Sequence, residues 1–274
     1  MTTLVVSPHL DDAVLSLPGF IRARALRGER VVVLTVFSEG DAGHATRRVE
    51  DLAALALLGA IPQHLGLRDA PLRRGVASSF RELVLRELAD DDIDAATVTH
   101  ALTLAIAAID ASSILLPLGV GEHIDHRIVH AAHAGLAGRV GFYEDRPYAL
   151  IQHAVRARLL RLGAAVDGAA VTPCPAAVDE FLAAARVAPH IHAYLPADER
   201  EVCLARLAAT LTLASPPSGL ALRSERLNFT PAVRSDAARA VQAYASQLAD
   251  LFGDEDIAAR FAEPYAERIY WRMD

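Results

Sequence analysis

The first half of the chain alternates short apolar runs with longer stretches of helical periodicity. Apolar runs bounded by turn signals are typical of strands buried on both faces, whereas apolar residues that recur every three or four positions are typical of helices. On this basis we predict strands at residues 3–7, 31–36, 64–66, 113–117 and 140–143. Helices are predicted between them, at residues 13–26, 46–58, 79–89, 95–109 and 125–137.

Strands that alternate with helices predict a parallel sheet covered on both faces. We therefore expect an α/β fold: a Rossmann-like, doubly wound, mostly parallel sheet of order 3-2-1-4-5 within about residues 1–150. Residues 151–274 are predicted to form a mainly helical C-terminal elaboration. Its clearest segments are helices at 176–187, 197–211 and 235–252 and a loop at 215–219. No internal repeat or flexible linker divides the chain, so residues 1–274 are interpreted as a single domain.

Two polar clusters follow strands that this order makes neighbours. His9, Asp11 and Asp12 come directly after the first strand, and Glu122, His123, Asp125 and His126 come after the fourth. In a doubly wound sheet, ligands bind outside the carboxyl ends of the strands, where the strand order reverses. The two clusters lie far apart in sequence, but they are therefore predicted to meet in one crevice.

These residue types suit a catalytic metal. Two imidazoles and one carboxylate are a frequent three-ligand set for zinc, with the fourth position left to water. A second carboxylate beside the metal can act as the base that takes a proton from that water. The adjacent Asp11 and Asp12 supply one carboxylate for each role, which explains two like charges side by side at a strand end.

Each residue also has a simpler interpretation. Asp12 and Asp125 both stand where a helix is predicted to begin, so either could be an N-cap. His130 and His133 share one helical face and are interpreted as supporting or incidental. In Pro-His-Ile-His-Ala-Tyr, residues 189–194, the histidines alternate like strand residues and could bind metal, although a polar turn is simpler. The co-occurrence of two acid-and-histidine clusters at adjacent strand ends favours the metal site.

The amino-acid composition excludes several classes of function. A net charge of −7 with 5% aromatic residues argues against nucleic-acid binding, which needs a basic face and stacking platforms. All 27 basic residues are arginines, which excludes mechanisms that need a Schiff-base lysine or a P-loop lysine. The two cysteines show no metal-binding spacing, which favours a reducing compartment.

No segment is expected to span a membrane. The longest apolar region, residues 101–121, is interrupted by Asp110, Pro117 and Gly119. The N-terminus has no basic residue ahead of its apolar stretch and reaches Asp11 early, so it does not read as a signal peptide. We therefore expect a cytoplasmic protein whose partner is a small molecule.

Two motifs together resemble a known family. Pro8-His9-Leu10-Asp11-Asp12, followed by His123-Ile124-Asp125-His126, is similar to the patterns Ala-His-Pro-Asp-Asp-Glu and His-x-x-His. These patterns belong to the LmbE-like, or PIG-L, family of zinc-dependent N-acetylglucosamine de-N-acetylases. Weaker matches are Arg47-x-x-Glu50, Leu58-Gly59, Leu65-Gly66 with Asp69, the stretch Tyr-Glu-Asp-Arg-Pro-Tyr-Ala from Tyr143, and Tyr244, Ser246 and Gln247. The resemblance extends over most of the chain.

The resemblance implies a role for each residue of the two main motifs. His9, Asp12 and His126 would hold one zinc ion per chain, with Fe²⁺ as an alternative divalent metal. Asp11 would be the general base, and His123 would help to stabilise the oxyanion.

The weaker matches imply a substrate-binding side. Arg47 and Asp69 match positions that contact sugar hydroxyls in related enzymes. Tyr143, Glu144 and Asp145 are assigned to substrate binding with them.

The chain also departs from the family pattern. Leu10 replaces the usual proline, a common variant that leaves the ligands intact, and Ala13 replaces the final glutamate of the first motif. The tyrosine often found just before the second motif is missing, with Gly119 and Gly121 nearby. These departures leave substrate size and pocket closure open more than they affect the reaction.

The expected function is metal-dependent hydrolysis of an N-acetylated amino sugar or its conjugate, which releases acetate and a free amine. A non-haem Fe(II) oxygenase uses the same ligand types. It does not need Asp11, however, and by fold analogy its ligand triad usually sits in a β-barrel. A non-catalytic zinc- or sugar-binding relative is a further alternative. The identity of the substrate stays open, as does the oligomeric state, including a homo-oligomer.

Overall fold

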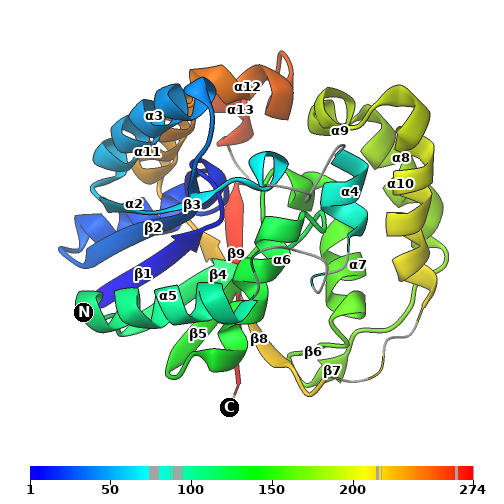
Figure 1. Cartoon of the computed structure of the whole chain (residues 1–274), viewed down its shortest axis with the longest axis horizontal. Helices are drawn as coiled ribbons and strands as arrows, with labels where there is room; N and C mark the ends of the chain where they lie inside the picture. Colours follow the sequence, from blue (N-terminus) through cyan, green and yellow to red (C-terminus); the bar gives the residue numbers. More distant parts are fainter. Residues whose placement is uncertain are drawn as a thin grey trace.

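One sheet forms the centre of the molecule. The computed structural model describes residues 1–73, 80–86, 88, 93, 95–213, 216, 218–262 and 265–273, and within them nine strands pair edge to edge (Figure 1). The strands are β1 (Thr2–Ser7), β2 (Arg30–Glu39), β3 (Ile61–Arg68), β4 (Ser113–Pro117), β5 (Arg139–Tyr143), β6 (Ala165–Val166), β7 (Ala169–Ala170), β8 (Ala221–Asn228) and β9 (Ala266–Arg272). Their order is β3-β2-β1-β4-β5-β9-β8-β6-β7.

The first five strands confirm the predicted topology. β1 pairs in parallel with β2 and with β4, while β3 and β5 pair in parallel on the outer sides of these two strands. Leu4 and Val6 of β1 pack into the hydrophobic core on one face of the sheet, and Val5 packs into the core on the other face. Because both faces are covered, β1 is a continuous apolar run without polar alternation.

Helices cover both faces. They are α1 (Asp12–Ser16), α2 (Pro18–Leu26), α3 (Ala42–Leu58), α4 (Phe80–Leu85), α5 (Ala95–Ile109), α6 (Ile124–Ala131), α7 (Ala154–Arg161), α8 (Ala177–Val187), α9 (Pro189–Tyr194), α10 (Ala197–Ala209), α11 (Pro231–Gln242), α12 (Ala245–Phe252) and α13 (Ile257–Arg260). Side chains of α1, α2, α3, α11 and α12 join one core, and those of α5, α6, α7, α8 and α10 join the other. In Figure 1, α3 and α11 lie side by side, whereas α8, α9 and α10 gather at the opposite end of the molecule.

Two of the predicted helices are each divided in two. The segment 13–26 forms α1 and α2, because Pro18 lacks the N–H group needed to continue α1 and instead opens α2. The segment 235–252 forms the end of α11 and the whole of α12, with the break at Tyr244. The hydroxyl of this buried tyrosine donates to Asp51 Oδ1 at 2.8 Å, so a tertiary contact fixes the break.

The boundaries of the other predicted elements differ less from those in the structure. The helix predicted at 125–137 ends at Ala131 and continues as a 3₁₀ turn, Ala132–Gly135. α3 begins before the predicted 46–58, because Asp41 accepts a hydrogen bond from the Gly43 N–H as its N-cap. Of the segment predicted as a helix at 79–89, the described part contains α4, while residues 79, 87 and 89 lie outside the described residues. Two residues of the predicted loop, 215 and 217, also lie outside them.

The second half of the chain is less helical than predicted. β9 pairs antiparallel with β5, and β8 pairs antiparallel with β9, so both strands extend the central sheet. β8 has the sequence Ala-Leu-Arg-Ser-Glu-Arg-Leu-Asn, whose charged and partly exposed residues give no buried-strand signal. The stretch 189–194, which alternates like a strand, is helix α9 with Pro189 in its first turn.

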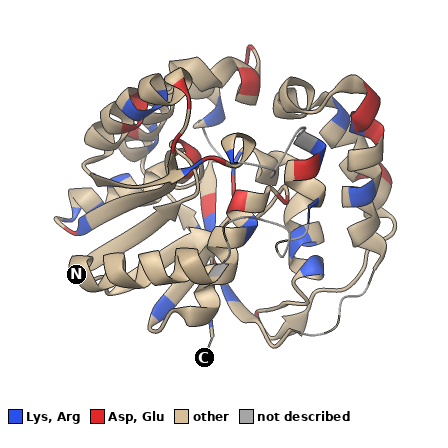
Figure 2. Ribbon diagram, viewed as in Figure 1, with Lys and Arg blue, Asp and Glu red and all other residues tan. Residues whose placement is uncertain are grey.

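Charged residues are dispersed over the visible surface. In the view of Figure 2, basic and acidic residues alternate along α3 and α10 and do not gather into one basic face. Among the described residues, no helix has the combination of length and apolar character that a bilayer crossing requires.

A buried carboxylate ties β9 to the start of α2. Glu267 is 1% exposed, and its two oxygens accept hydrogen bonds from the N–H groups of Gly19 and Phe20 at 2.7 and 2.8 Å. A Cβ atom at Gly19 would lie 2.8 Å from the same carboxylate, so the close approach requires glycine. Burial raises the pKa of Glu267 to about 7.

The raised pKa of Glu267 predicts a pH dependence of stability. Because the folded protein holds this proton more tightly than the unfolded chain, the stabilising contribution is full below the ordinary glutamate pKa of 4.5 and is lost as the pH rises to about 7. We expect the unfolding free energy of wild type to fall relative to Glu267→Gln by about 1–3 kcal/mol over that interval. Chemical denaturation of both proteins across this pH range measures the difference, and parallel pH profiles would contradict it.

Candidate metal centre and active-site cavity

The two polar clusters lie together at the carboxyl ends of β1 and β4. His126 Nε2 lies 3.2 Å from Asp12 Oδ2, and the rings of His9 and His123 pack edge to face with centroids 5.0 Å apart. The parallel pairing of β1 with β4 brings both strand ends to the same edge of the sheet. All four side chains belong to buried residues.

Three of these side chains converge as a potential ligand set. Asp12 Oδ2 lies 3.2 Å from His9 Nδ1 and 3.2 Å from His126 Nε2. Tetrahedral coordination with bonds of about 2.1 Å would hold neighbouring ligand atoms about 3.4 Å apart. The spacing and the donor types therefore fit a divalent metal ion. A second potential group among the described residues consists of His9, His123 and Asp125.

The other nitrogen of each histidine in the first group faces a carboxylate. His9 Nε2 lies 3.1 Å from Asp125 Oδ2, and His126 Nδ1 lies 2.7 Å from Asp145 Oδ1. Carboxylates in this position fix the tautomer of a metal-ligating histidine and raise its basicity. The arrangement leaves His9 Nδ1 and His126 Nε2 directed at Asp12, which favours the first group as the metal site.

Asp125 is held by further contacts. Its Oδ1 lies 2.7 Å from the Arg73 guanidinium, and its Oδ2 accepts a hydrogen bond from the Ala70 N–H at 3.1 Å. A carboxylate that is already paired with arginine and imidazole orients His9 and is a poor candidate for a metal ligand. These contacts disfavour the second group.

The interpretation of Asp12 and Asp125 as helix caps was wrong. The N-cap of α1 is Asp11, and in the described part of the chain its carboxylate makes no capping hydrogen bond. Asp12 Oδ2 instead accepts a hydrogen bond from the His9 N–H at 2.9 Å. The N-cap of α6 is His123, whose Nδ1 accepts from the Asp125 N–H at 3.3 Å.

The adjacent aspartates have opposite electrostatic environments. Burial raises the pKa of Asp11, an effect that Arg47 partly opposes with its guanidinium 3.4 Å from Oδ1. Burial also acts to raise the pKa of Asp12, but the charges and hydrogen bonds of His126 and His9 outweigh it and hold that pKa well below its usual range. Asp12 therefore stays ionised, while Asp11 is the better proton acceptor near neutral pH.

His123 is a neutral hydrogen-bond donor. Burial, followed by the charge of His9, lowers its pKa to about 3. Because Nδ1 accepts from the Asp125 N–H, the neutral ring carries its proton on Nε2. Such a group can donate a hydrogen bond to an oxygen that gains negative charge.

Arg47 and Asp69 lie together beside His9. Arg47 Nη1 is 3.8 Å from Asp69 Oδ2, and Asp69 Oδ1 is 3.4 Å from His9 Nε2. His44, which no motif identified, lies 3.1 Å from Asp69 through Nε2 and 3.1 Å from Asp41 through Nδ1. His44 therefore holds Asp69 in place, and only the packing of α3 against the end of β3 reveals it.

Three residues assigned to substrate binding have other contacts, which corrects that assignment. The fully buried Tyr143 donates its hydroxyl to the Val6 carbonyl at 2.9 Å. Glu144 accepts from the Tyr270 hydroxyl at 2.9 Å. Asp145 is fully buried and holds His126 in place, as described above. The described residues that line the active-site cavity include none of the three.

Two weak sequence matches meet in the structure. The Ser246 N–H and hydroxyl donate to Glu50 at 2.8 and 2.6 Å, which ties α12 to α3. The Tyr244–Asp51 hydrogen bond strengthens the same connection. Gln247 lines the active-site cavity.

The active-site cavity has a volume of about 210 Å³. Its lining is His9, Asp11, Asp12, Leu15, Arg47, Asp69, Pro71, Leu83, His123, His126, Pro147, Tyr148, Tyr194, Gln247 and Leu251. Tyr148 belongs to the weak family match that begins at Tyr143, but sequence reasoning assigned it no role, and it missed Tyr194 altogether. The two residues come from the loop after β5 and from the end of α9.

The remaining histidines lie outside the potential ligand groups and the cavity lining. His130 Nδ1 lies 3.0 Å from the Pro117 carbonyl, and His133 Nδ1 lies 2.7 Å from the His130 carbonyl. His190 is buried and packs edge-on against Tyr148, with centroids 5.3 Å apart.

Comparison with known proteins confirms the resemblance found in the two motifs. Residues 4–136 match the family model described as PIG-L, GlcNAc-PI de-N-acetylase. The 2'-N-acetylparomamine deacetylase of Streptomyces fradiae is 36% identical over 165 residues. That alignment covers 54% of this chain and only 57% of the relative's length.

Solved structures confirm the fold. The teicoplanin-biosynthesis deacetylase in its bog complex superposes with a TM-score of 0.66 at 22% identity, covering 100% of this chain and 99% of that one. The A40926 pseudoaglycone deacetylase superposes with a TM-score of 0.62 at 23% identity, covering 99% and 96%. The mixed α/β architecture is therefore shared over nearly the whole chain.

The metal ligands can be tested against a neighbouring histidine. We expect Asp12→Ala and His126→Ala to lose bound zinc, because each removes one of three ligands. His130→Ala should keep it, since that ring faces the Pro117 carbonyl. Metal analysis of the purified variants decides the matter. Loss of zinc in His130→Ala with retention in His126→Ala would show that the ligand assignment is wrong.

The orienting role of Asp145 has a matched control in the adjacent acid. Asp145→Asn should weaken zinc binding by about 10–100-fold, because it disturbs the carboxylate that orients His126. Glu144→Gln should leave zinc affinity unchanged, since Glu144 bonds Tyr270 instead. Competition with a fluorescent zinc chelator measures both affinities. Equal affinities in the two variants would contradict this role for Asp145.

Proposed function

We propose that this protein is a zinc-dependent N-deacetylase of the cytoplasm that hydrolyses an N-acetylated amino sugar or its conjugate to acetate and a free amine. The observation that carries the proposal is the convergence of His9, Asp12 and His126 with Asp11 at their side in one cavity. A ligand set alone would suit several metal proteins. The additional, differently tuned carboxylate is what hydrolysis requires.

The metal would be held by His9 Nδ1, Asp12 Oδ2 and His126 Nε2. Bound there, zinc would polarise the acetyl carbonyl and lower the pKa of water toward about 7. Asp125 and Asp145 keep the two imidazoles in the tautomers that ligation needs.

Asp11 would act as the general base. Its carboxylate faces the same cavity as the ligands, and burial raises its pKa, so it can take a proton from the attacking water. Once protonated, it can return that proton to the departing amine nitrogen. The Arg47 guanidinium lies against Asp11 Oδ1 and holds the carboxylate in place.

His123 would stabilise the charge that develops on the carbonyl oxygen. Its depressed pKa keeps the ring neutral, so its Nε2–H is a hydrogen-bond donor. A fixed donor in a buried site needs no reorganisation as the oxygen becomes negative, so it favours the transition state over the ground state.

Arg47 and Asp69 would bind the sugar. A cation and an anion side by side in the cavity wall offer hydrogen-bond donors and acceptors to hydroxyl groups. The name of the Streptomyces fradiae relative, a 2'-N-acetylparomamine deacetylase, supports an amino-sugar conjugate as the substrate class.

Acetate release tests the proposed function directly. The zinc-loaded protein is incubated with a panel that includes N-acetylglucosamine conjugates and 2'-N-acetylparomamine, and acetate is quantified. We expect release that stops on chelation and returns with zinc. Oxygen-dependent turnover with Fe²⁺ would support the oxygenase alternative, and absence of turnover on the whole panel would support a binding protein.

Asp11→Asn separates the base from the ligands. The substitution keeps the shape and the three metal ligands but removes the proton acceptor, so zinc content should be retained while kcat falls by roughly 10²–10⁴. KM should change far less, because the lost interaction acts mainly in the transition state. Metal analysis and deacetylation kinetics measure both effects, with Asp12→Asn as the comparison that should lose metal. A fully active Asp11→Asn enzyme would disprove the mechanism.

A further inference from the structure

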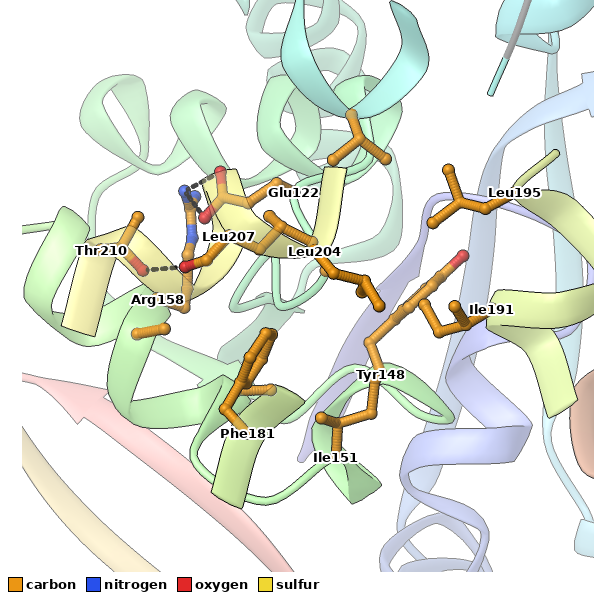
Figure 3. Close-up of a pocket in the computed structure, with 14 residues that line it drawn as sticks. Glu122, Tyr148, Ile151, Arg158, Phe181, Ile191, Leu195, Leu204, Leu207 and Thr210 are labelled. Carbon is orange, nitrogen blue, oxygen red and sulfur yellow. Dashed lines mark hydrogen bonds and ion pairs between the residues drawn. The ribbon is translucent and has the colours of Figure 1, made fainter. Parts of the chain in front are cut away.

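A second, apolar pocket lies directly behind the active-site cavity. Its walls come from α7, α8, α9 and α10, and Figure 3 shows Ile151, Phe181, Ile191 and Leu204 arranged around it. Its volume is about 40 Å³. A single water molecule needs about 10–15 Å³ of this volume, so the pocket has room for a small apolar group.

The charged groups of this pocket satisfy each other. Arg158 Nη1 donates to both carboxylate oxygens of Glu122, at 3.2 and 3.1 Å (Figure 3). Arg158 Nε donates to the Leu118 carbonyl at 2.9 Å. Both charged side chains are buried. The pocket therefore suits an apolar ligand and offers no unpaired charge to a polar one.

Tyr148 separates this pocket from the active-site cavity. Its side chain lines both. The ring packs edge-on against His126 on one side and His190 on another, with centroids 5.8 and 5.3 Å away. A Cβ atom at Gly121 would lie 2.5 Å from the ring, so the absence of a side chain there leaves space for Tyr148.

The orientation of an amide substrate follows from the two ligating histidines. Asp69, which would bind the sugar with Arg47, lies against His9, whereas Tyr148 lies against His126. If the amide carbonyl carbon lies between these histidines, the nitrogen that carries the sugar is on the His9 side and the acyl substituent is on the His126 side. The acyl substituent therefore points at Tyr148.

We propose that Tyr148 limits the length of the acyl group and that the apolar pocket behind it is a subsite for N-acyl chains longer than acetyl. This inference rests on the proposed deacetylase function. In the wild-type protein the phenol ring closes the subsite. Removal of the ring joins the pocket to the active-site cavity.

The test measures binding, so it does not depend on turnover. Two probes carry the same six-carbon tail at different places: N-hexanoylglucosamine has it on the acyl group, and hexyl N-acetylglucosaminide has it on the anomeric oxygen. Their affinities, and that of N-acetylglucosamine, are measured by calorimetry on the zinc-loaded protein in an Asp11→Asn background, which blocks hydrolysis. Failure of the proposed function would appear separately, as absence of acetate release by the enzyme that retains Asp11.

We expect Tyr148→Ala to raise the affinity for N-hexanoylglucosamine, relative to N-acetylglucosamine, by at least about tenfold. Burial of one methylene is worth about fourfold in an equilibrium constant, and the opened subsite takes two or more. The affinity for the hexyl glycoside relative to N-acetylglucosamine should stay unchanged. Adding Leu204→Trp to Tyr148→Ala should refill the pocket and abolish the gain.

If thermal denaturation shows that Tyr148→Ala is not folded, Tyr148→Leu is used in its place. We expect it to raise the affinity for N-hexanoylglucosamine in the same direction, by a smaller factor. The proposal is overturned by any of three results in a folded variant. The first is an unchanged or unmeasurable affinity for N-hexanoylglucosamine at millimolar concentration. The second is a gain that survives Leu204→Trp, and the third is a gain for the hexyl glycoside in place of the N-hexanoyl probe.

Discussion

The arrangement of the active-site cavity depends on the buried negative charge that is concentrated at the ends of β1 and β4. Five carboxylates, those of Asp11, Asp12, Asp69, Asp125 and Asp145, are each at most 8% exposed and gather around two histidines. Buried carboxylates are costly unless a cation or several hydrogen bonds compensate them. Arginines beside Asp11 and Asp125 supply part of this compensation, and the imidazoles supply more. A divalent cation in the proposed ligand set would complete it, so the electrostatics favour the ion that the proposed chemistry uses.

The same constraint divides the roles of two chemically identical neighbours. Asp11 and Asp12 are adjacent in the chain, but their side chains point in different directions. Asp12 faces two imidazoles, whereas Asp11 faces an arginine and the active-site cavity. Their pKa values consequently move in opposite directions. Each partner comes from a different element of the fold, namely α3 for the arginine and α6 for His126. The tuning is therefore a property of the assembled sheet and helices.

The two halves of the chain contribute different parts of the site. The family match ends at residue 136 and includes the proposed metal ligands, the proposed base and the proposed oxyanion donor. The cavity lining also includes Tyr148, Tyr194, Gln247 and Leu251, which all follow that boundary. α12 is fastened to α3 by the hydrogen bonds between Ser246 and Glu50. The proposed reaction and the proposed sugar-binding pair thus depend on the N-terminal half, whereas the proposed limit on acyl length depends on Tyr148 of the C-terminal half.

The sequence by itself determined the five parallel strands, their order and the meeting of the two motif clusters. Continuous apolar runs and the two motifs are local signals, and the rules for doubly wound sheets convert them into a position in space. The sequence did not reveal β8 and β9, because β9 forms only against the edge of β5 and the largely charged β8 forms only against β9. It also misplaced Tyr143, Glu144 and Asp145. One strand end directs successive side chains into the core, towards β9 and towards His126, and only the packed neighbours decide which contact each one makes. The roles of His44 and Tyr148 could not be read from the sequence for the same reason: they arise from contacts between elements, although Tyr148 lies in the weak family match that begins at Tyr143.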